Sequence, residues 1–157
     1  MKSLFYFTIY FFFLIGCSDV SLSIDEKKPQ FEEIFFDVVE KKLILDDKLP
    51  KNIKNLASDW YDNKVKTNGF DGKMTFEIYG YQENIFNIVN GKKAELSIKF
   101  VVKIENSPLT KRKIIEGDVS AYGTITGDFS LNDFDVIIKN TQADLIIILS
   151  SDLKSKI

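Results

Sequence analysis

Apolar residues in the first half of the chain repeat every three or four positions over one stretch. Between residues 50 and 69 they share a single helical face, formed by Ile53, Leu56, Ala57, Trp60, Tyr61 and Val65. This spacing predicts an amphipathic helix. Pro50 suits a first helical turn, where a missing N–H costs no hydrogen bond, and Asn68-Gly69 is a stop signal. Trp60, the only tryptophan, lies in the middle of the stripe, so we expect it in the core.

Strict alternation of apolar and polar residues replaces this pattern after residue 73. It runs through Met74, Phe76 and Ile78, then Leu96, Ile98, Phe100, Val102 and Ile104, and then Ile115, Val119, Ala121 and Ile125. Such alternation is typical of strands with one buried and one wet face. Asn90-Gly91 and Asn106-Ser107-Pro108 are turn sequences between these strands, so we expect an antiparallel meander. Gly117, Gly123 and Gly127 interrupt the last strand and predict bulges or extra twist.

Two further segments carry mixed patterns. Residues 31–45 fit a helical stripe in part, but their β-branched and aromatic content favours a strand. Ser130 and Asp133 have the spacing of a capping box, and apolar residues then recur at helical spacing to about residue 154, although Ile146-Ile147-Ile148 would also suit a strand. We predict an α+β fold with an antiparallel sheet of three to four strands, two helices packed on one face and the order β-α-β-β-β-α.

The N-terminal residues have a different pattern, in which one positive charge precedes an apolar run. Lys2 is followed by apolar residues at 4–15, a run with the length of a secretory signal and shorter than the ~20 residues that a membrane-spanning helix needs. The run ends at Leu14-Ile15-Gly16-Cys17, which resembles the lipobox of bacterial lipoproteins. The alternative is an ordinary signal peptide, or a buried helix, whose cysteine is incidental.

The lipobox resemblance implies a covalent anchor at Cys17. In that family a diacylglyceryl thioether forms on the cysteine sulfur, signal peptidase II cuts before it, and the new amino group is often acylated with a chain such as palmitate. Two or three acyl chains hold a protein stably, whereas one binds only marginally. Ser18, directly after the cysteine, favours the outer over the inner membrane under enterobacteria-like sorting. We therefore expect a protein anchored in the cell envelope and facing the periplasm.

These assignments divide the chain into three parts. A signal peptide covers residues 1–16, a lipidated cysteine and tether cover 17–30, and a single α+β domain covers 31–157. Val20, Leu22 and Ile24 alternate within the tether, so a weak edge strand is the alternative there. A body of this length can bury one sufficient core. Because Cys17 is the only cysteine, the mature body has no thiol left for an internal disulfide.

Charge and residue types limit the chemistry. The formal net charge is −2 and becomes more negative when Lys2 is removed, which argues against nucleic acid and against a polybasic lipid-binding surface. The chain has no histidine, the commonest general base and metal ligand. Adjacent acids point to opposite sides of an extended chain, so we interpret pairs such as Asp25-Glu26 as solvated charge. We predict no catalytic residue, no cofactor and no metal site.

Three tyrosines form the one candidate contact surface. Tyr79, Tyr81 and Tyr122 fall on the expected wet side of the sheet, and tyrosines are enriched where proteins meet. The competing interpretation is that they shield the sheet or pack against the first strand.

The body is also similar to small uncharacterised bacterial lipoproteins, through Leu49-Pro50, Trp60, Lys64, Gly69, Gly72 and Phe76-Glu77-Ile78. In element order and length it resembles the lipopolysaccharide-assembly lipoproteins of the outer membrane, although it lacks the Gly-Phe and nearby proline that often follow the cysteine there.

Together with the anchor, these features favour a non-enzymatic binding or scaffold protein with an envelope protein as partner. The alternatives are a carrier of a small apolar or lipid ligand and, less favoured, a carboxylate-based hydrolase.

Overall fold

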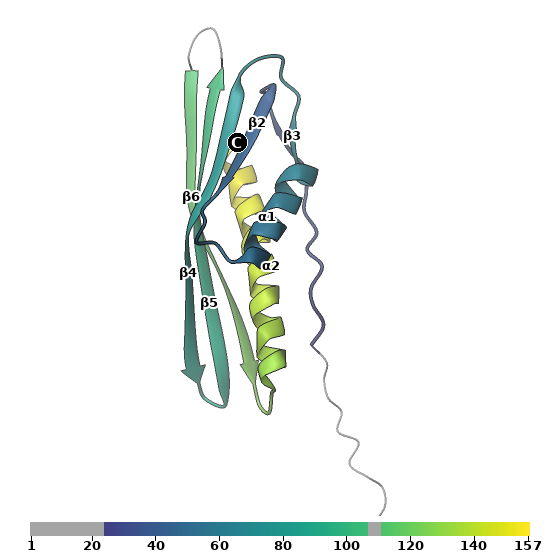
Figure 1. Cartoon of the computed structure of the whole chain (residues 1–157), viewed down its shortest axis with the longest axis vertical. Coiled ribbons are helices and arrows are strands. Elements are labelled where there is room, and N and C mark those ends of the chain that lie inside the picture. The colour runs from purple at the N-terminus through teal and green to yellow at the C-terminus, as the bar shows by residue number, and fades with distance from the viewer. Residues whose placement is uncertain (1–23, 107–110) are drawn as a thin grey trace, which may run out of the picture.

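The computed structural model describes residues 24–106 and 111–157, which form two layers (Figure 1). The elements in chain order are β1 (Ile34–Phe36), β2 (Glu40–Leu45), α1 (Lys51–Lys64), β3 (Val65–Thr67), β4 (Lys73–Ile88), β5 (Gly91–Asn106), β6 (Lys111–Thr126) and α2 (Leu131–Lys156). A four-stranded sheet in the order β2-β4-β5-β6 is one layer. Both helices lie on the same face of it, and the predicted α+β class and two-helix arrangement are confirmed.

The start of the domain differs in detail from the expected single strand. Residues 31–45 contain two strands, because β1 pairs with β3 in a small parallel sheet whereas β2 pairs with β4 in the main one. The chain changes direction near Val38, where the N–H of Gly69 donates to the Val38 carbonyl at 3.2 Å. The β2-α1-β4 connection makes β2 parallel to β4, so the main sheet is mixed rather than wholly antiparallel.

The predicted meander of long strands is confirmed. β4, β5 and β6 pair antiparallel, with Ile88 opposite Gly91 at the β4-β5 turn. Asn90 in that turn adopts a positive φ of 54°, a conformation that asparagine tolerates better than most residues. The apolar positions predicted to face inward in β4 are buried, as are those of β5 from Leu96 to Val102 and those of β6.

Aromatic side chains fill the centre of the core. The Trp60 ring meets Phe76 edge-on with centroids 5.5 Å apart, and Phe76 stacks on Phe100 at 5.9 Å. Trp60 is only 1% exposed, which confirms its predicted place in the core. Edge-to-face and offset contacts of this kind add to the stabilisation that burial alone provides.

Helix α2 begins at the predicted cap and runs along the sheet without reaching its far end (Figure 1). The Ser130 side chain accepts from the Asp133 N–H, and the Asp133 carboxylate accepts from the Ser130 N–H, a complete capping box. The alternative strand at 146–148 is wrong, because Leu145, Ile146, Leu149 and Leu153 are buried at helical spacing. Among the described residues, no helix combines the length and the apolar character needed to cross a membrane.

Two glycines of β6 act differently from the prediction. The β5-β6 register is continuous, so neither Gly117 nor Gly123 forms a bulge. A Cβ at Gly117 would lie 2.3 Å from the Phe100 ring, and one at Gly123 would lie 2.2 Å from the Thr141 hydroxyl. The absence of side chains at these two positions therefore lets the core ring and α2 approach the strand. Of the three glycines named in the prediction, Gly127, just after β6, is the one with a positive φ, 85°.

Candidate functional site

The sheet has one face that neither helix covers. Charged side chains cross this open face between strands, as in Lys103–Glu77 at 2.8 Å and Lys73–Glu105 at 3.2 Å. Apolar residues also lie on this face, among them Ile44 and Ile114, which are exposed, and Val101, which is 7% exposed among its neighbours. The open face is therefore a wet surface patterned by ion pairs, as alternation predicted.

Tyr79 and Tyr122 lie on this open face, as expected. Tyr79 is 41% exposed on β4, and Tyr122 is 72% exposed on β6. They are not neighbours, because Tyr79 lies opposite Lys99 whereas Tyr122 lies opposite Glu95 on the intervening strand. Strand spacing puts them on the order of 16 Å apart. The structure therefore does not join them into a single patch.

Tyr81 does not share that face, and its expected placement there is corrected. The β4-β5 register shifts between Tyr79 and Gln82, and Gly80 in this bulge has a φ of 68°. A bulge adds a residue and reverses which side chains face inward. The Tyr81 ring consequently packs against the core, and its hydroxyl donates to Glu83. Burial raises the pKa of the Tyr81 phenol well above its ordinary value, and the bond to Glu83 acts in the same direction.

The edge of the sheet lies beside Tyr122. Within the described residues, β6 pairs with β5 on one side and with no strand on the other, over its full span from Lys111 to Thr126. A free edge presents unpaired N–H and C=O groups that can accept another strand. We call this feature the β6 edge, defined as the outer backbone of Lys111–Thr126 together with the Tyr122 side chain.

A second feature is an extended segment, Ile24–Glu32, which we call the N-terminal strap. It lies along α2, with Lys27 near Asp144 and Glu32 near Lys154, so strap and helix run in the same direction. Ile24 and Phe31 pack onto apolar clusters at the two ends of the strap. These residues fall mostly within the segment expected to be a tether, and they are bound to the body rather than free of it.

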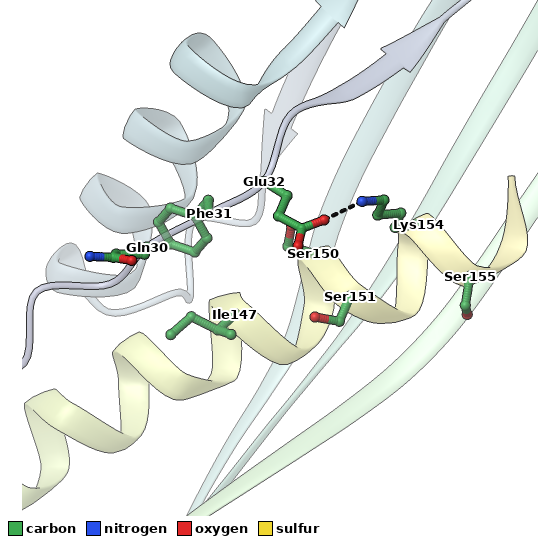
Figure 2. Close-up of a pocket in the computed structure, with 8 residues that line it drawn as sticks. All are labelled: Gln30, Phe31, Glu32, Ile147, Ser150, Ser151, Lys154 and Ser155. Atoms are coloured by element: carbon green, nitrogen blue, oxygen red, sulfur yellow. Dashed lines mark hydrogen bonds and ion pairs between the residues drawn. The ribbon is translucent and has the colours of Figure 1, made fainter.

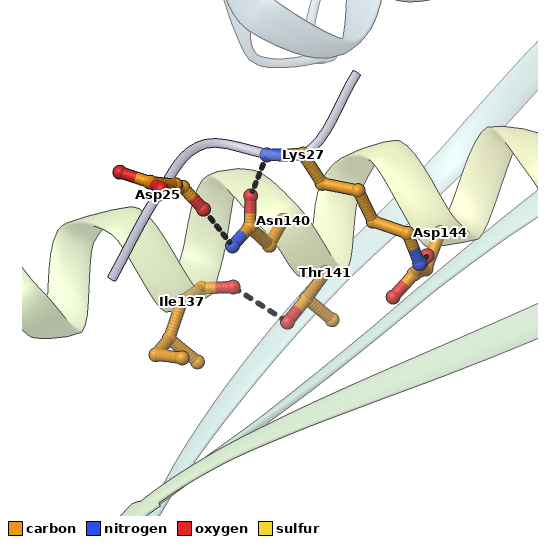
Figure 3. Close-up of polar contacts among 6 residues, drawn as sticks. All are labelled: Asp25, Lys27, Ile137, Asn140, Thr141 and Asp144. Atoms are coloured by element: carbon orange, nitrogen blue, oxygen red, sulfur yellow. Dashed lines mark hydrogen bonds and ion pairs between the residues drawn. The ribbon is translucent and has the colours of Figure 1, made fainter. Parts of the chain in front are cut away.

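Asn140 holds the strap by its backbone. Its Oδ1 accepts from the Lys27 N–H at 2.7 Å, and its Nδ2 donates to the Asp25 carbonyl at 3.1 Å (Figure 3). Lys139 pairs with Glu26 at 2.5 Å beside it. One side-chain amide thus satisfies two backbone groups of an extended chain, as a neighbouring strand would. No sequence signal predicts this clamp, because its partners are more than a hundred positions apart.

An open groove of about 460 Å³ separates the strap from the C-terminal half of α2 (Figure 2). Its lining residues are Gln30, Phe31, Glu32, Ile147, Ser150, Ser151, Lys154 and Ser155. Phe31 and Ile147 are the apolar members, and the Glu32–Lys154 ion pair lies at its wall. The lining therefore exposes polar and apolar surface to a similar extent, and it lies outside the filled core.

Across residues 24–106 and 111–157, no three Asp, Glu or Cys side chains gather in a way that could hold a metal ion. Lys41 is partly buried. Its amine donates to the carbonyls of Tyr61 at 3.1 Å and Val65 at 2.6 Å, so it caps the C-terminal end of α1. Burial lowers the pKa of this Lys41 amine. Cys17, the predicted lipidation site, lies outside the described residues.

Comparison with known proteins finds solved structures that are similar to this chain at low sequence identity. No protein-family model matches the chain, and no curated protein is significantly similar to it. A minor lipoprotein of Acinetobacter baumannii has 15% identity and a TM-score of 0.47, over 76% of this chain and 92% of that one. Rare lipoprotein B of Shewanella oneidensis has 11% identity and a TM-score of 0.42, over 74% and 97%.

A third solved structure is similar to the same extent. Uncharacterized lipoprotein B of Nitrosomonas europaea has 9% identity and a TM-score of 0.46, over 83% of this chain and 92% of that one. The expected resemblance to small bacterial lipoproteins is confirmed at this level. At such identities the likeness is one of overall fold alone.

Proposed function

We propose that the protein is a non-enzymatic scaffold of the bacterial cell envelope, anchored through lipid on Cys17 and facing the periplasm from the outer membrane. In this proposal it binds a protein partner along the β6 edge. The anchor is supported by the order of Lys2, the apolar run and Leu14-Ile15-Gly16-Cys17. The choice of outer membrane is supported by Ser18, the residue after the cysteine.

The β6 edge is the observation that carries the binding function. Its strand is 16 residues long and keeps an unbroken register with β5. Regular edges accept an added strand through backbone hydrogen bonds, and neighbouring side-chain sites then supply specificity. Tyr122 stands at such a site, and the Lys93 amine lies 5.2 Å from its ring centroid. Tyr79, two strands away, remains a predicted contact only for a partner that also covers the open face.

Site-specific photo-crosslinking tests the proposed surface. A benzophenone amino acid replaces Tyr122, and cells are irradiated before their envelopes are isolated. We expect one discrete adduct from this position and none from Phe70, a fully exposed residue in the loop before β4. The Cys17→Ala variant, which cannot be acylated, should lose the adduct. No adduct at Tyr122, or equal adducts at Tyr122 and Phe70, would contradict binding at the β6 edge.

The carrier function is supported less well. A carrier of an apolar ligand needs an apolar cavity of several hundred Å³. Between the sheet and the helices lie large side chains that are less than 2% exposed, among them Trp60, Phe76, Phe100, Leu145 and Leu149. The groove beside the strap has the volume, but it is open to solvent and six of its eight lining residues are polar or charged. These observations favour the scaffold over the carrier.

Intact-mass analysis of the membrane-extracted protein tests the anchor separately. We expect the loss of residues 1–16 and the added mass of two or three acyl chains on the peptide that begins at Cys17. A mature chain in the aqueous fraction with an unmodified thiol would contradict the proposed anchoring.

A further inference from the structure

One end of the molecule carries a group of exposed apolar side chains. This end consists of the β4-β5 turn and the β6-α2 turn, which the Gly127 N–H joins by donating to the Asn90 carbonyl at 2.8 Å. We call it the hairpin end, and its exposed apolar residues are Ile85, Phe86, Ile88, Val89 and Leu131. Val89 is 88% exposed and Leu131 is 76% exposed. Clustered exposure of this kind is typical of a surface that meets another apolar phase or a partner.

The strap leads the N-terminus toward this same end. Ile24, the first described residue, packs with Phe134 and Ile125 in a small cluster, and Lys92 also reaches the Phe134 ring. Lys92 is paired with Ile125 and lies three residues beyond Val89. At about 3.3 Å per residue the cluster is therefore roughly 10 Å from the tip of the turn. The Asn140 clamp fixes the direction in which the chain leaves the body (Figure 3).

The length of chain before Ile24 limits where the anchor can lie. Seven residue steps separate Cys17 from Ile24, and a fully extended chain of that length spans at most about 25 Å. This is enough to pass the tip while the strap remains docked. The opposite end of the sheet is out of reach, because β4 has 16 residues and extends for roughly 50 Å.

We propose that the hairpin end rests on the lipid surface that holds the anchor, with Ile88 and Val89 in the headgroup region and the long axis of the sheet pointing away from the membrane. This inference rests on the proposed lipidation of Cys17. The occupant of the apolar end is then the bilayer itself, brought to it by the few residues between Cys17 and Ile24.

Charge has little part in this contact. Basic and acidic residues are mixed near the hairpin end, as Lys92, Lys93, Asp128, Asp133 and Asp135. A contact made by apolar side chains should persist at high salt, where attraction between exposed charges is screened.

Fluorescent labels at single cysteines test the orientation, because an acylated Cys17 leaves an introduced cysteine as the only free thiol. The acylated Val89→Cys, Leu131→Cys and Phe70→Cys variants are labelled with a polarity-sensitive nitrobenzoxadiazole dye. Each is reconstituted into vesicles of phosphatidylethanolamine and phosphatidylglycerol that contain doxyl-labelled lipid. Phe70 is the matched control, since it is fully exposed and lies in the loop before β4, at the other end of that strand. Intact mass is recorded on every sample, and circular dichroism checks the fold.

We expect blue-shifted emission and several-fold stronger quenching at positions 89 and 131 than at position 70, at low and at high salt. Emission typical of water at all three positions in an acylated protein would overturn the inference about orientation, and the proposed lipidation of Cys17 would be unaffected. Equal quenching at all three would overturn it too, because the body would then lie flat. An unmodified Cys17 would overturn the proposed anchoring, and this inference with it.

Discussion

The indole Nε1 of Trp60 donates a hydrogen bond to the hydroxyl of Ser150 at 3.1 Å, and both side chains are buried. This bond joins α1 to α2 inside the core. Ser150→Ala removes the acceptor, and a buried donor without a partner costs about 1–3 kcal/mol. We expect the free energy of unfolding to fall by that amount in urea titrations followed by the fluorescence of Trp60.

Ser151→Ala is the matched control for that substitution, because Ser151 is exposed on the next position of the same helix. Its free energy of unfolding should stay close to that of the unchanged protein. An equal fall in the free energy of unfolding of both variants would show that the Trp60–Ser150 hydrogen bond is not the cause.

Asn140→Ala should release the strap. Two hydrogen bonds to the strap backbone are lost, each worth on the order of 1 kcal/mol, but alanine is also the better helix former. The two effects oppose each other, so the free energy of unfolding does not report release of the strap. Amide hydrogen exchange reports directly on the strap, and we expect the Lys27 N–H to exchange much faster in the variant. Asn132→Ala, an exposed position on the same helix, carries the helix-propensity gain without the clamp and should leave that exchange rate unchanged.

Gly117→Ala should destabilise the protein through overpacking. The new methyl group would lie 2.3 Å from the Phe100 ring and 2.6 Å from the Asp152 carboxylate. Inserting a group into a packed site typically costs about 1–3 kcal/mol. Thermal and urea unfolding measure the effect. Gly127→Asn is the comparison, since nothing lies within 4 Å of that site and asparagine tolerates a positive φ. A stable Gly117→Ala protein would contradict the close approach of β6 to the core ring.

The capping box of α2 predicts a pH dependence. Hydrogen bonds from the backbone and side chain of Ser130 hold the pKa of Asp133 below its ordinary value of 3.8. A carboxyl with a depressed folded pKa adds stability that is present above the unfolded pKa and is lost as pH falls through the folded one. The stability difference between the unchanged protein and Asp133→Asn should thus be present at neutral pH and shrink below 3.8. A difference that is constant over this range would exclude the ionised cap.

The elements that local pattern determines could be predicted from the sequence. Alternation from Leu96 to Ile104 identified a strand, the stripe around Trp60 identified a helix, and Ser130 with Asp133 identified the start of α2. Each signal lies within a few residues, where the repeat of a strand or a helix acts directly on the chain. The wet face that carries Tyr79 and Tyr122 follows from the same alternation.

Features that depend on distant contacts could not be predicted in this way. The bulge at Gly80 moves Tyr81 to the helix side, and its register shift is visible only against β5. Gly117 and Gly123 read as interruptions of a strand, whereas their role is set by Phe100 and α2. The division of residues 31–45 into two strands depends on where β3 and β4 lie.

The strap packs residues 24–32 against α2, although the residues that contact each other lie more than a hundred positions apart. During synthesis Asp25 and Lys27 emerge long before Asn140, and contacts so distant in sequence form late. Docking of the strap onto α2 would therefore be among the last steps in the folding of the described residues.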